Sequence, residues 1–136
     1  MAYTKPIGVA FTDQDINGAN VVLVDEQLGY TTAGQGTVTQ LTSKSTAVTL
    51  DKPAGQITMN NAALAGNTAV SFTFNNSFIS TNDILLLAIA GNATTGAYTA
   101  YVTNLATGAA GIALRNLSAG SLSEAVVLNF ALIHCV

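Results

Sequence analysis

Apolar and polar residues alternate along most of the chain with a period of two, the pattern of strands that bury one face. In residues 70–74, Val70, Phe72 and Phe74 share one face, and Ser71 and Thr73 share the other. Similar segments, separated by turns rich in Gly, Asn and Pro, lie at residues 37–42, 46–50, 56–59, 83–90, 97–103, 111–117 and 124–134. The pattern predicts eight strands in an all-β, jelly-roll-like antiparallel β-sandwich.

One of these segments departs from the alternation. Residues 84–90 read Ile-Leu-Leu-Leu-Ala-Ile-Ala and are apolar on both faces. A strand of this kind is buried on both sides. We therefore expect either a central strand or one that a neighbouring subunit covers.

The first 35 residues differ from the rest of the chain. Apolar-rich segments at residues 9–16 and 19–24 flank Asn17-Gly18, a strong signal for a two-residue hairpin turn. Residues 29–36 are mostly small, with three Gly, two Thr and one Ala, as in a linker. The sequence predicts an N-terminal hairpin or arm with its linker at residues 1–35 and a β-sandwich domain at residues 36–136.

Charge is scarce on this chain. Only 11 of 136 residues are formally charged, whereas 49% are hydrophobic. The 18 Thr, 12 Asn and 8 Ser can cover part of the surface with uncharged polar groups. A typical soluble domain is about 25% charged, so we expect further cover from other subunits, most simply in a homo-oligomer.

The same composition argues against several partners. The cations Lys5, Lys44, Lys52 and Arg115 are too few for a phosphate-binding patch, and the net charge is −3. We therefore expect no nucleic-acid partner. The apolar runs fall well short of the roughly 20 residues that span a bilayer, so we expect no membrane partner. The N-terminal sequence has no hydrophobic signal segment, which indicates a protein made in a cytoplasm.

One motif matches half of a calcium loop. Asp13, Asp15 and Asn17 alternate as oxygen ligands do, and Gly18 permits a sharp bend. The position of the closing bidentate Glu holds Val24 instead. We favour a hairpin with solvent-facing charges, and a calcium loop of another type stays open as the alternative.

The sequence gives little support for a catalytic or metal-binding site. His134 is the single histidine and Cys135 the single cysteine, so neither a zinc cluster nor an intrachain disulfide is expected. Asp83 and Glu124 are the one carboxylate pair worth testing for glycoside hydrolysis, although both sit where strands begin. We predict no enzyme, no catalytic residues, no cofactor and no metal.

Two tyrosines bear on a binding role. Tyr98 and Tyr101 fall on opposite faces of one predicted strand, so one ring should point outward. An exposed aromatic ring can stack on a sugar. This gives a glycan-binding alternative.

Several short blocks carry a resemblance. They are Gly36-Thr-Val-Thr-Gln, Lys44-Ser-Thr-Ala-Val-Thr-Leu, Gly55-Gln-Ile-Thr-Met-Asn, Val70-Ser-Phe-Thr-Phe and the segment from Ser121 to Ile133. In these blocks the chain resembles small structural proteins of tailed bacteriophages, which include capsid cement (decoration) proteins and modules of trimeric fibres or spikes. The resemblance implies a virion protein, usually trimeric, that binds the major capsid protein. The alternative that it implies is a tail fibre or spike module that recognises a host glycan.

Features of the chain itself favour a capsid cement protein over a tail fibre or spike module. It lacks the long repetitive shaft or the heptads that a free-standing fibre needs. Its predicted N-terminal hairpin and linker suit an arm that lies across a neighbouring surface.

Overall fold

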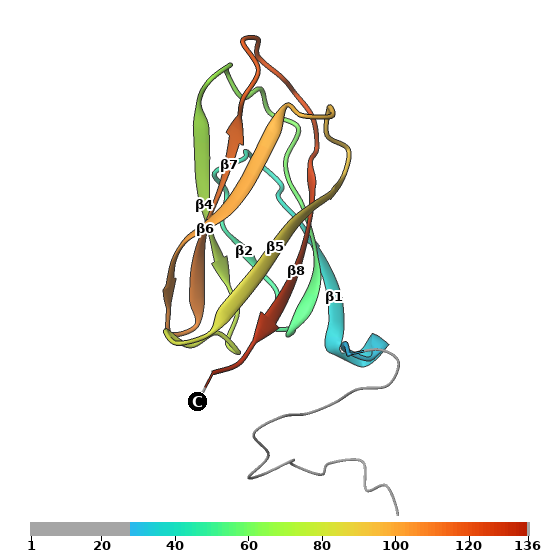
Figure 1. The fold of residues 1–136 in the computed structure, drawn as a ribbon, viewed down its shortest axis with the longest axis vertical. Helices are drawn as coiled ribbons and strands as arrows, with labels where there is room; N and C mark the ends of the chain where they lie inside the picture. Colours follow the sequence, from blue (N-terminus) through green and yellow to red (C-terminus); the bar gives the residue numbers. More distant parts are fainter. Residues whose placement is uncertain (1–27, 136) are drawn as a thin grey trace, which may run out of the picture.

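The computed structural model describes residues 28–135 and consists almost entirely of β-strands (Figure 1). A short 3-10 helix, η1 (Thr32–Gly34), precedes the first strand. The strands are β1 (Gln35–Thr39), β2 (Val48–Thr49), β3 (Ala54–Thr58), β4 (Ala69–Asn75), β5 (Ile84–Gly91), β6 (Tyr98–Ala106), β7 (Ala109–Asn116) and β8 (Val127–Ile133). Each overlaps one of the segments expected from the alternation, so the all-β prediction is confirmed.

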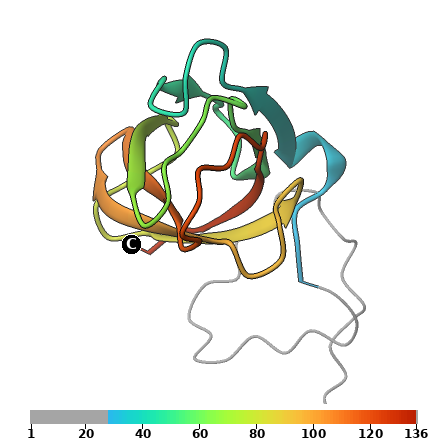
Figure 2. The same ribbon diagram turned by 90° about the horizontal axis from the view of Figure 1, so that it is seen from above.

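The strands form two four-stranded sheets that pack face to face (Figure 2). The first sheet has the order β1-β3-β8-β5 and the second the order β2-β4-β7-β6. From β1 to β5 the chain changes sheet at every strand. The chain reverses its direction each time it crosses to the other sheet, so every second strand runs the same way. For this reason β3 is parallel to β1, and β4 is parallel to β2. The other four pairings are antiparallel.

The sandwich is therefore confirmed, whereas the jelly-roll topology is not. A jelly roll belongs to the antiparallel architectures, and both sheets here include a parallel pair. The turn residues mark where a strand ends, but they do not say which sheet the next strand joins. This is why the sequence pattern predicts the layers better than the strand order.

The core lies between the two sheets. Phe72 and Phe74 of β4 point inward and are almost fully buried, as the alternation predicts. The Phe74 ring meets the Phe130 ring of the opposite sheet edge to face, with the centroids 4.8 Å apart. Edge-to-face pairs add stability beyond the buried area alone. This contact joins the two sheets across the core.

The position of β5 corrects one expectation. β5 is an edge strand of the first sheet, because β8 lies between it and β3. The alternative of a central strand is therefore wrong. Its outward side chains Ile84 and Leu86 are each 51% exposed, so within residues 28–135 about half of each side chain stays uncovered.

The predicted hairpin at residues 9–24 and the calcium half-motif at residues 13–18 lie outside the described residues. The stretch at 29–36, which we expected to be a linker, contains η1 and the first two residues of β1. Gly36 pairs with Gly55 across β1 and β3. A Cβ atom on Gly36 would lie 2.9 Å from Cδ1 of Leu50, so the glycine lets Leu50 pack closely at this side of the sandwich.

Candidate binding surface

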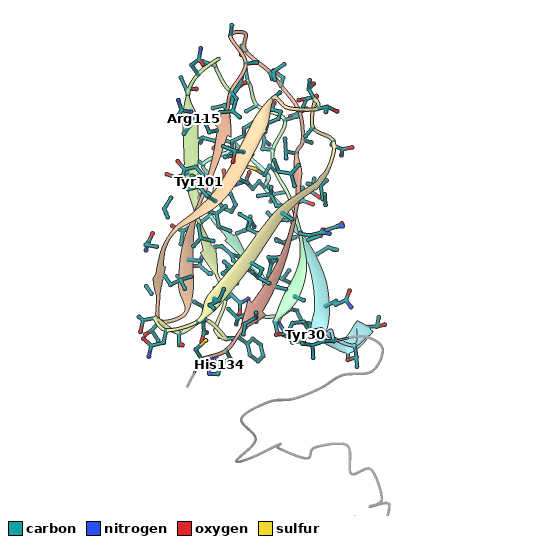
Figure 3. The ribbon with its side chains drawn as sticks, in the orientation of Figure 1. Tyr30, Tyr101, Arg115 and His134 are labelled. Carbon is teal, nitrogen blue, oxygen red and sulfur yellow. The ribbon has the colours of Figure 1, made fainter. Side chains whose placement is uncertain are left out.

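The outer face of the first sheet is the most distinctive surface of the molecule. Side chains that point away from the second sheet form rows across the four strands. Two successive rows are Thr37, Gln56, Asn129 and Ala88, then Gln35, Ala54, Ala131 and Leu86. None of the residues in the four strands carries a formal charge. The outer face of the second sheet, in contrast, includes Arg115 of β7 (Figure 3).

One part of this outer face is apolar. We call Leu28, Tyr30, Ile84, Leu86 and Ile133 the apolar patch; every one of them is at least 41% exposed. Ile84 and Ile133 are paired in register at the end of the sheet where the C-terminus lies. Four of the five patch residues also line a groove of about 390 Å³, and Ile84 completes the patch beside it.

The other part of the outer face is polar and uncharged. Hydroxyl and amide side chains from η1, β1, β3 and β8 line an open groove of about 480 Å³. They are Thr32, Gln35, Thr37, Gln56 and Asn129. The groove's one aromatic residue, Phe130, is 4% exposed and points into the core. The groove therefore offers hydrogen-bonding groups but no exposed ring for stacking.

Tyr30 fixes the first described residues against the sheet. Its hydroxyl donates a hydrogen bond to the carbonyl oxygen of Leu132. The side-chain amide of Gln35 donates to the carbonyl oxygen of Tyr30 at 2.8 Å. These contacts hold the chain before β1 at the edge of the groove that carries the apolar patch. Figure 3 shows Tyr30 and His134 at the same end of the molecule.

Asp83 and His134 form a polar cluster beside the apolar patch. The buried carboxylate of Asp83 lies 2.8 Å from Nδ1 of the exposed His134. It also accepts hydrogen bonds from the backbone N–H of Cys135 at 3.0 Å and from the backbone and hydroxyl of Ser80 at 2.8 Å each. Burial raises the pKa of Asp83, but these hydrogen bonds outweigh it and hold the pKa well below its usual value.

This cluster ties the end of the chain to the start of β5. Burying a charge is costly unless the charge is paired and hydrogen-bonded. The hydrogen bonds from these donors supply that stabilisation for the buried carboxylate of Asp83. The Sγ atom of Cys135 lies 3.9 Å from the carbonyl oxygen of Ile133. The cluster therefore acts as a clamp between the end of the chain and the start of β5. His134 also lines the groove that carries the apolar patch.

A second polar cluster surrounds Lys44, which is 3% exposed. Its Nζ donates to the carbonyl oxygens of Asn60 and Glu124, the latter at 2.6 Å. Burial lowers the pKa of Lys44, and the negative charge of Glu124 partly opposes this. The Glu124 carboxylate accepts hydrogen bonds from the backbone N–H and the hydroxyl of Thr94 at 3.2 and 2.8 Å.

The proposed carboxylate pair is not brought together. Asp83 precedes β5, whereas Glu124 bonds Thr94, which follows the far end of β5. An eight-residue strand is about 26 Å long, so the two carboxylates lie far beyond the separations of roughly 5–10 Å that glycosidases use. The hypothesis of a glycosidase pair is therefore wrong.

The two tyrosines do face opposite ways, as expected. Tyr98 is 8% exposed, and its hydroxyl has no hydrogen-bond partner among the described residues. Burial and the nearby Glu124 carboxylate raise the pKa of Tyr98 to about 12. Tyr101 is 44% exposed on the outer face of the second sheet, with Arg115 on the neighbouring strand (Figure 3). The exposed ring and the polar groove therefore belong to different sheets.

Sequence reasoning missed both polar clusters. The Ser80–Asp83 spacing, a Ser followed three residues later by Asp, is a local signal for the hydrogen bonds between them. The contact with His134 depends on the register of β5 against β8, which only the fold supplies.

Residues 28–135 contain no group of three or more His, Cys, Asp or Glu side chains placed to hold a metal ion. No helix in this part of the chain is long and apolar enough to cross a membrane. No known protein family, curated protein or solved structure matches the chain in comparisons of sequence and structure.

Proposed function

We propose that the protein is a capsid cement protein of a tailed bacteriophage, a non-enzymatic virion component that binds the major capsid protein as a homotrimer. The uncharged outer face of the first sheet carries this proposal. A face that presents hydroxyl groups, amides and apolar side chains can dock on a protein lattice without ion pairs. The trimer itself rests on the resemblance to phage structural proteins.

The two parts of the face suit two contacts. The apolar patch serves association between copies, since exposed apolar patches mark interfaces. The polar groove, whose lining includes the paired residues Gln56 and Asn129, serves the capsid contact. Its hydrogen bonds supply register and specificity, while the scarcity of charge makes binding insensitive to salt.

The test is binding to undecorated capsids, measured by sedimentation and by counting bound copies in micrographs. The wild type should occupy a fixed number of sites at both 50 mM and 500 mM salt. Gln56→Lys places a charge in the polar groove and should reduce occupancy on the order of 10-fold, the effect of about 1.4 kcal/mol. Thr73→Lys, on the outer face of the second sheet, is the matched control and should bind normally. Full occupancy by Gln56→Lys would show that this groove does not face the capsid.

A module of a trimeric tail fibre or spike is the second candidate, and one observation favours it. The polar groove of about 480 Å³ is large enough for a sugar and is lined by groups that bond sugar hydroxyls. Absence of capsid binding together with retention on a host-surface glycan array would select this function.

A further inference from the structure

Three of the four edge strands of the sandwich carry features that hinder pairing with another chain. β2 has two residues, which is too short to act as a template. β1 presents Gln35, Thr37 and Thr39 outward. β6 carries Thr and Asn side chains and a bulge between Val102 and Asn104. Short edges, polar side chains and bulges are the devices that block edge pairing.

β5, the fourth edge strand, has almost none of these devices. Its eight residues, Ile-Leu-Leu-Leu-Ala-Ile-Ala-Gly, include no polar side chain. Its bulge lies at the far end, between Ile89 and Gly91, which leaves residues 84–89 regular. Within residues 28–135 only β8 pairs with it. β5 is therefore the edge best able to accept another strand.

Half of the backbone groups of residues 84–89 point away from β8. The N–H of Leu132 in β8 donates to the carbonyl oxygen of Pro53, just before β3, so Leu132 faces β3. Hydrogen-bonded and non-bonded pairs alternate along antiparallel strands, so its partner Leu85 makes no backbone bond to β8. Leu85, Leu87 and Ile89 therefore turn their N–H and C=O groups to the free edge. No hydrogen bond among the described residues uses these groups.

We propose that a second copy of the chain pairs with this edge, β5 against β5, antiparallel about a twofold axis at Leu87. Leu87 then exchanges two hydrogen bonds with Leu87 of the second copy. Leu85 exchanges two with Ile89 of the second copy, and Ile89 does the same with Leu85. This register pairs all three residues that face the free edge. An axis at Leu86 or Ala88 would pair only two of them within residues 84–89.

The side chains fit one another in this register. On the outer face Leu86 lies opposite Ala88 of the second copy, in a non-bonded pair where side chains approach closely. The small alanine leaves room for the leucine. On the inner face Leu87 and Ile89 are only partly buried, and Leu87 and Leu85 of the second copy add cover to them. Neither strand carries a charge that would oppose the contact.

The pairing of two β5 edges ends with two chains. A twofold contact uses the same surface on both partners, so no free β5 edge remains after it forms. The joined sheet then ends in β1 on both sides, and β1 presents polar side chains. This gives a second copy an advantage over an open series of copies, because a closed pair removes the apolar edge instead of extending it.

The contact is weak and differs in symmetry from the proposed trimer. Six strand residues span about 20 Å, and a strip of this length is small beside the roughly 1,200 Å² that a stable interface buries. The pairing therefore joins molecules at high concentration or where they already lie side by side. It does not depend on capsid binding, and its tests use the free full-length protein.

Disulfide trapping tests the partner and the register. Two single-cysteine proteins are made in a Cys135→Ser background, one with Leu86→Cys and the other with Ala88→Cys. Mild oxidation of their mixture should give heterodimers about 10-fold faster than either protein alone gives homodimers, since only the mixed pair places the Cβ atoms within reach. Thr73→Cys, on the outer face of the second sheet, is the control partner and should form none with Ala88→Cys. Equal rates for mixed and single proteins would overturn the register.

Hydrogen exchange tests the backbone pairing without a cysteine. The amides of Leu85, Leu87 and Ile89 should gain protection on the order of 10-fold or more as the protein concentration rises. Those of Leu86 and Ala88, which face β8, should not change with concentration.

A charged variant separates this pairing from other causes of protection. Ala88→Lys places a charge on the edge strand, a device that prevents pairing, and should abolish the gain. Thr73→Lys should keep it. Protection that does not depend on concentration would assign the edge to another part of the same chain and overturn the proposal. Rapid exchange at every concentration, or a gain that survives Ala88→Lys, would overturn it as well.

Discussion

The imidazole of His134 contacts the buried carboxylate of Asp83, with Nδ1 and Oδ1 2.8 Å apart. The contact follows from one register: β5 and β8 pair antiparallel with Ile84 opposite Ile133, which places the preceding Asp83 against the following His134. A single carboxylate thus joins the beginning of the edge strand to the end of the central strand.

Asp83→Asn should lower stability at pH 7, because an amide replaces a carboxylate that accepts four hydrogen bonds. The pKa of Asp83 is depressed in the folded state, so its stabilisation is full above the unfolded value of 3.8. It is lost as the pH falls below that value toward the folded pKa. Urea unfolding from pH 7 to pH 2.5 should show the gap between variant and wild type closing with acid.

His134→Ala provides the comparison for Asp83→Asn. It removes one of the four contacts and leaves the donors Ser80 and Cys135 in place. Its loss of stability at pH 7 should be the smaller of the two. A gap between Asp83→Asn and wild type that stays constant down to pH 2.5 would show that the charge of the carboxylate is not what stabilises the clamp.

Lys44→Met should destabilise the protein by about 1–3 kcal/mol, since the carbonyl oxygens of Asn60 and Glu124 lose their shared donor. Burial lowers the pKa of Lys44, so the unfolded chain holds this proton more tightly than the folded one. Wild-type stability should therefore rise relative to the variant as the pH increases from 8 to 10. Equal pH profiles for the two proteins in chemical unfolding would contradict this account.

Local alternation was sufficient to predict the strands. Phe72 and Phe74 are buried and Ser71 and Thr73 exposed because a strand places neighbours on opposite faces whatever its partner. Strand order is not a local property. The two apolar faces of residues 84–90 left open a central strand or a strand covered by another subunit. β5 lies at an edge of its sheet, and nothing within the segment indicates that β8 pairs between it and β3.

The candidate surface shows the same division. The absence of charge from four strands is visible in the sequence, but their gathering into one sheet is not, because β1 and β5 lie in different parts of the chain. The sequence pattern does not predict that Lys44 is buried. Its burial results from long-range contacts with Asn60 and Glu124 that no short motif encodes.

Phe72→Ala should lower the free energy of unfolding by about 3–5 kcal/mol, as expected when a buried aromatic ring is truncated and leaves a cavity. Phe72 is 4% exposed on the inner face of β4 and pairs in register with the fully buried Ile112. Ser71→Ala, on the outer face of the same strand, is the control and should change stability by less than about 0.5 kcal/mol. An unfolding midpoint of Phe72→Ala close to that of Ser71→Ala would refute the core assignment.

The purified protein should be a homo-oligomer, and we expect a trimer, at micromolar concentration in light scattering. The physical reason is the apolar patch, in which Ile84, Leu86 and Ile133 are each about half exposed. Leu86→Lys places a charge in the patch and should shift the particle toward the monomer mass, because burying an unpaired charge at an interface is costly. Thr73→Lys adds the same charge to the second sheet and should keep the wild-type mass. A monodisperse wild-type monomer would remove the patch as a subunit contact, and a stable oligomer of Leu86→Lys would place that contact elsewhere on the molecule.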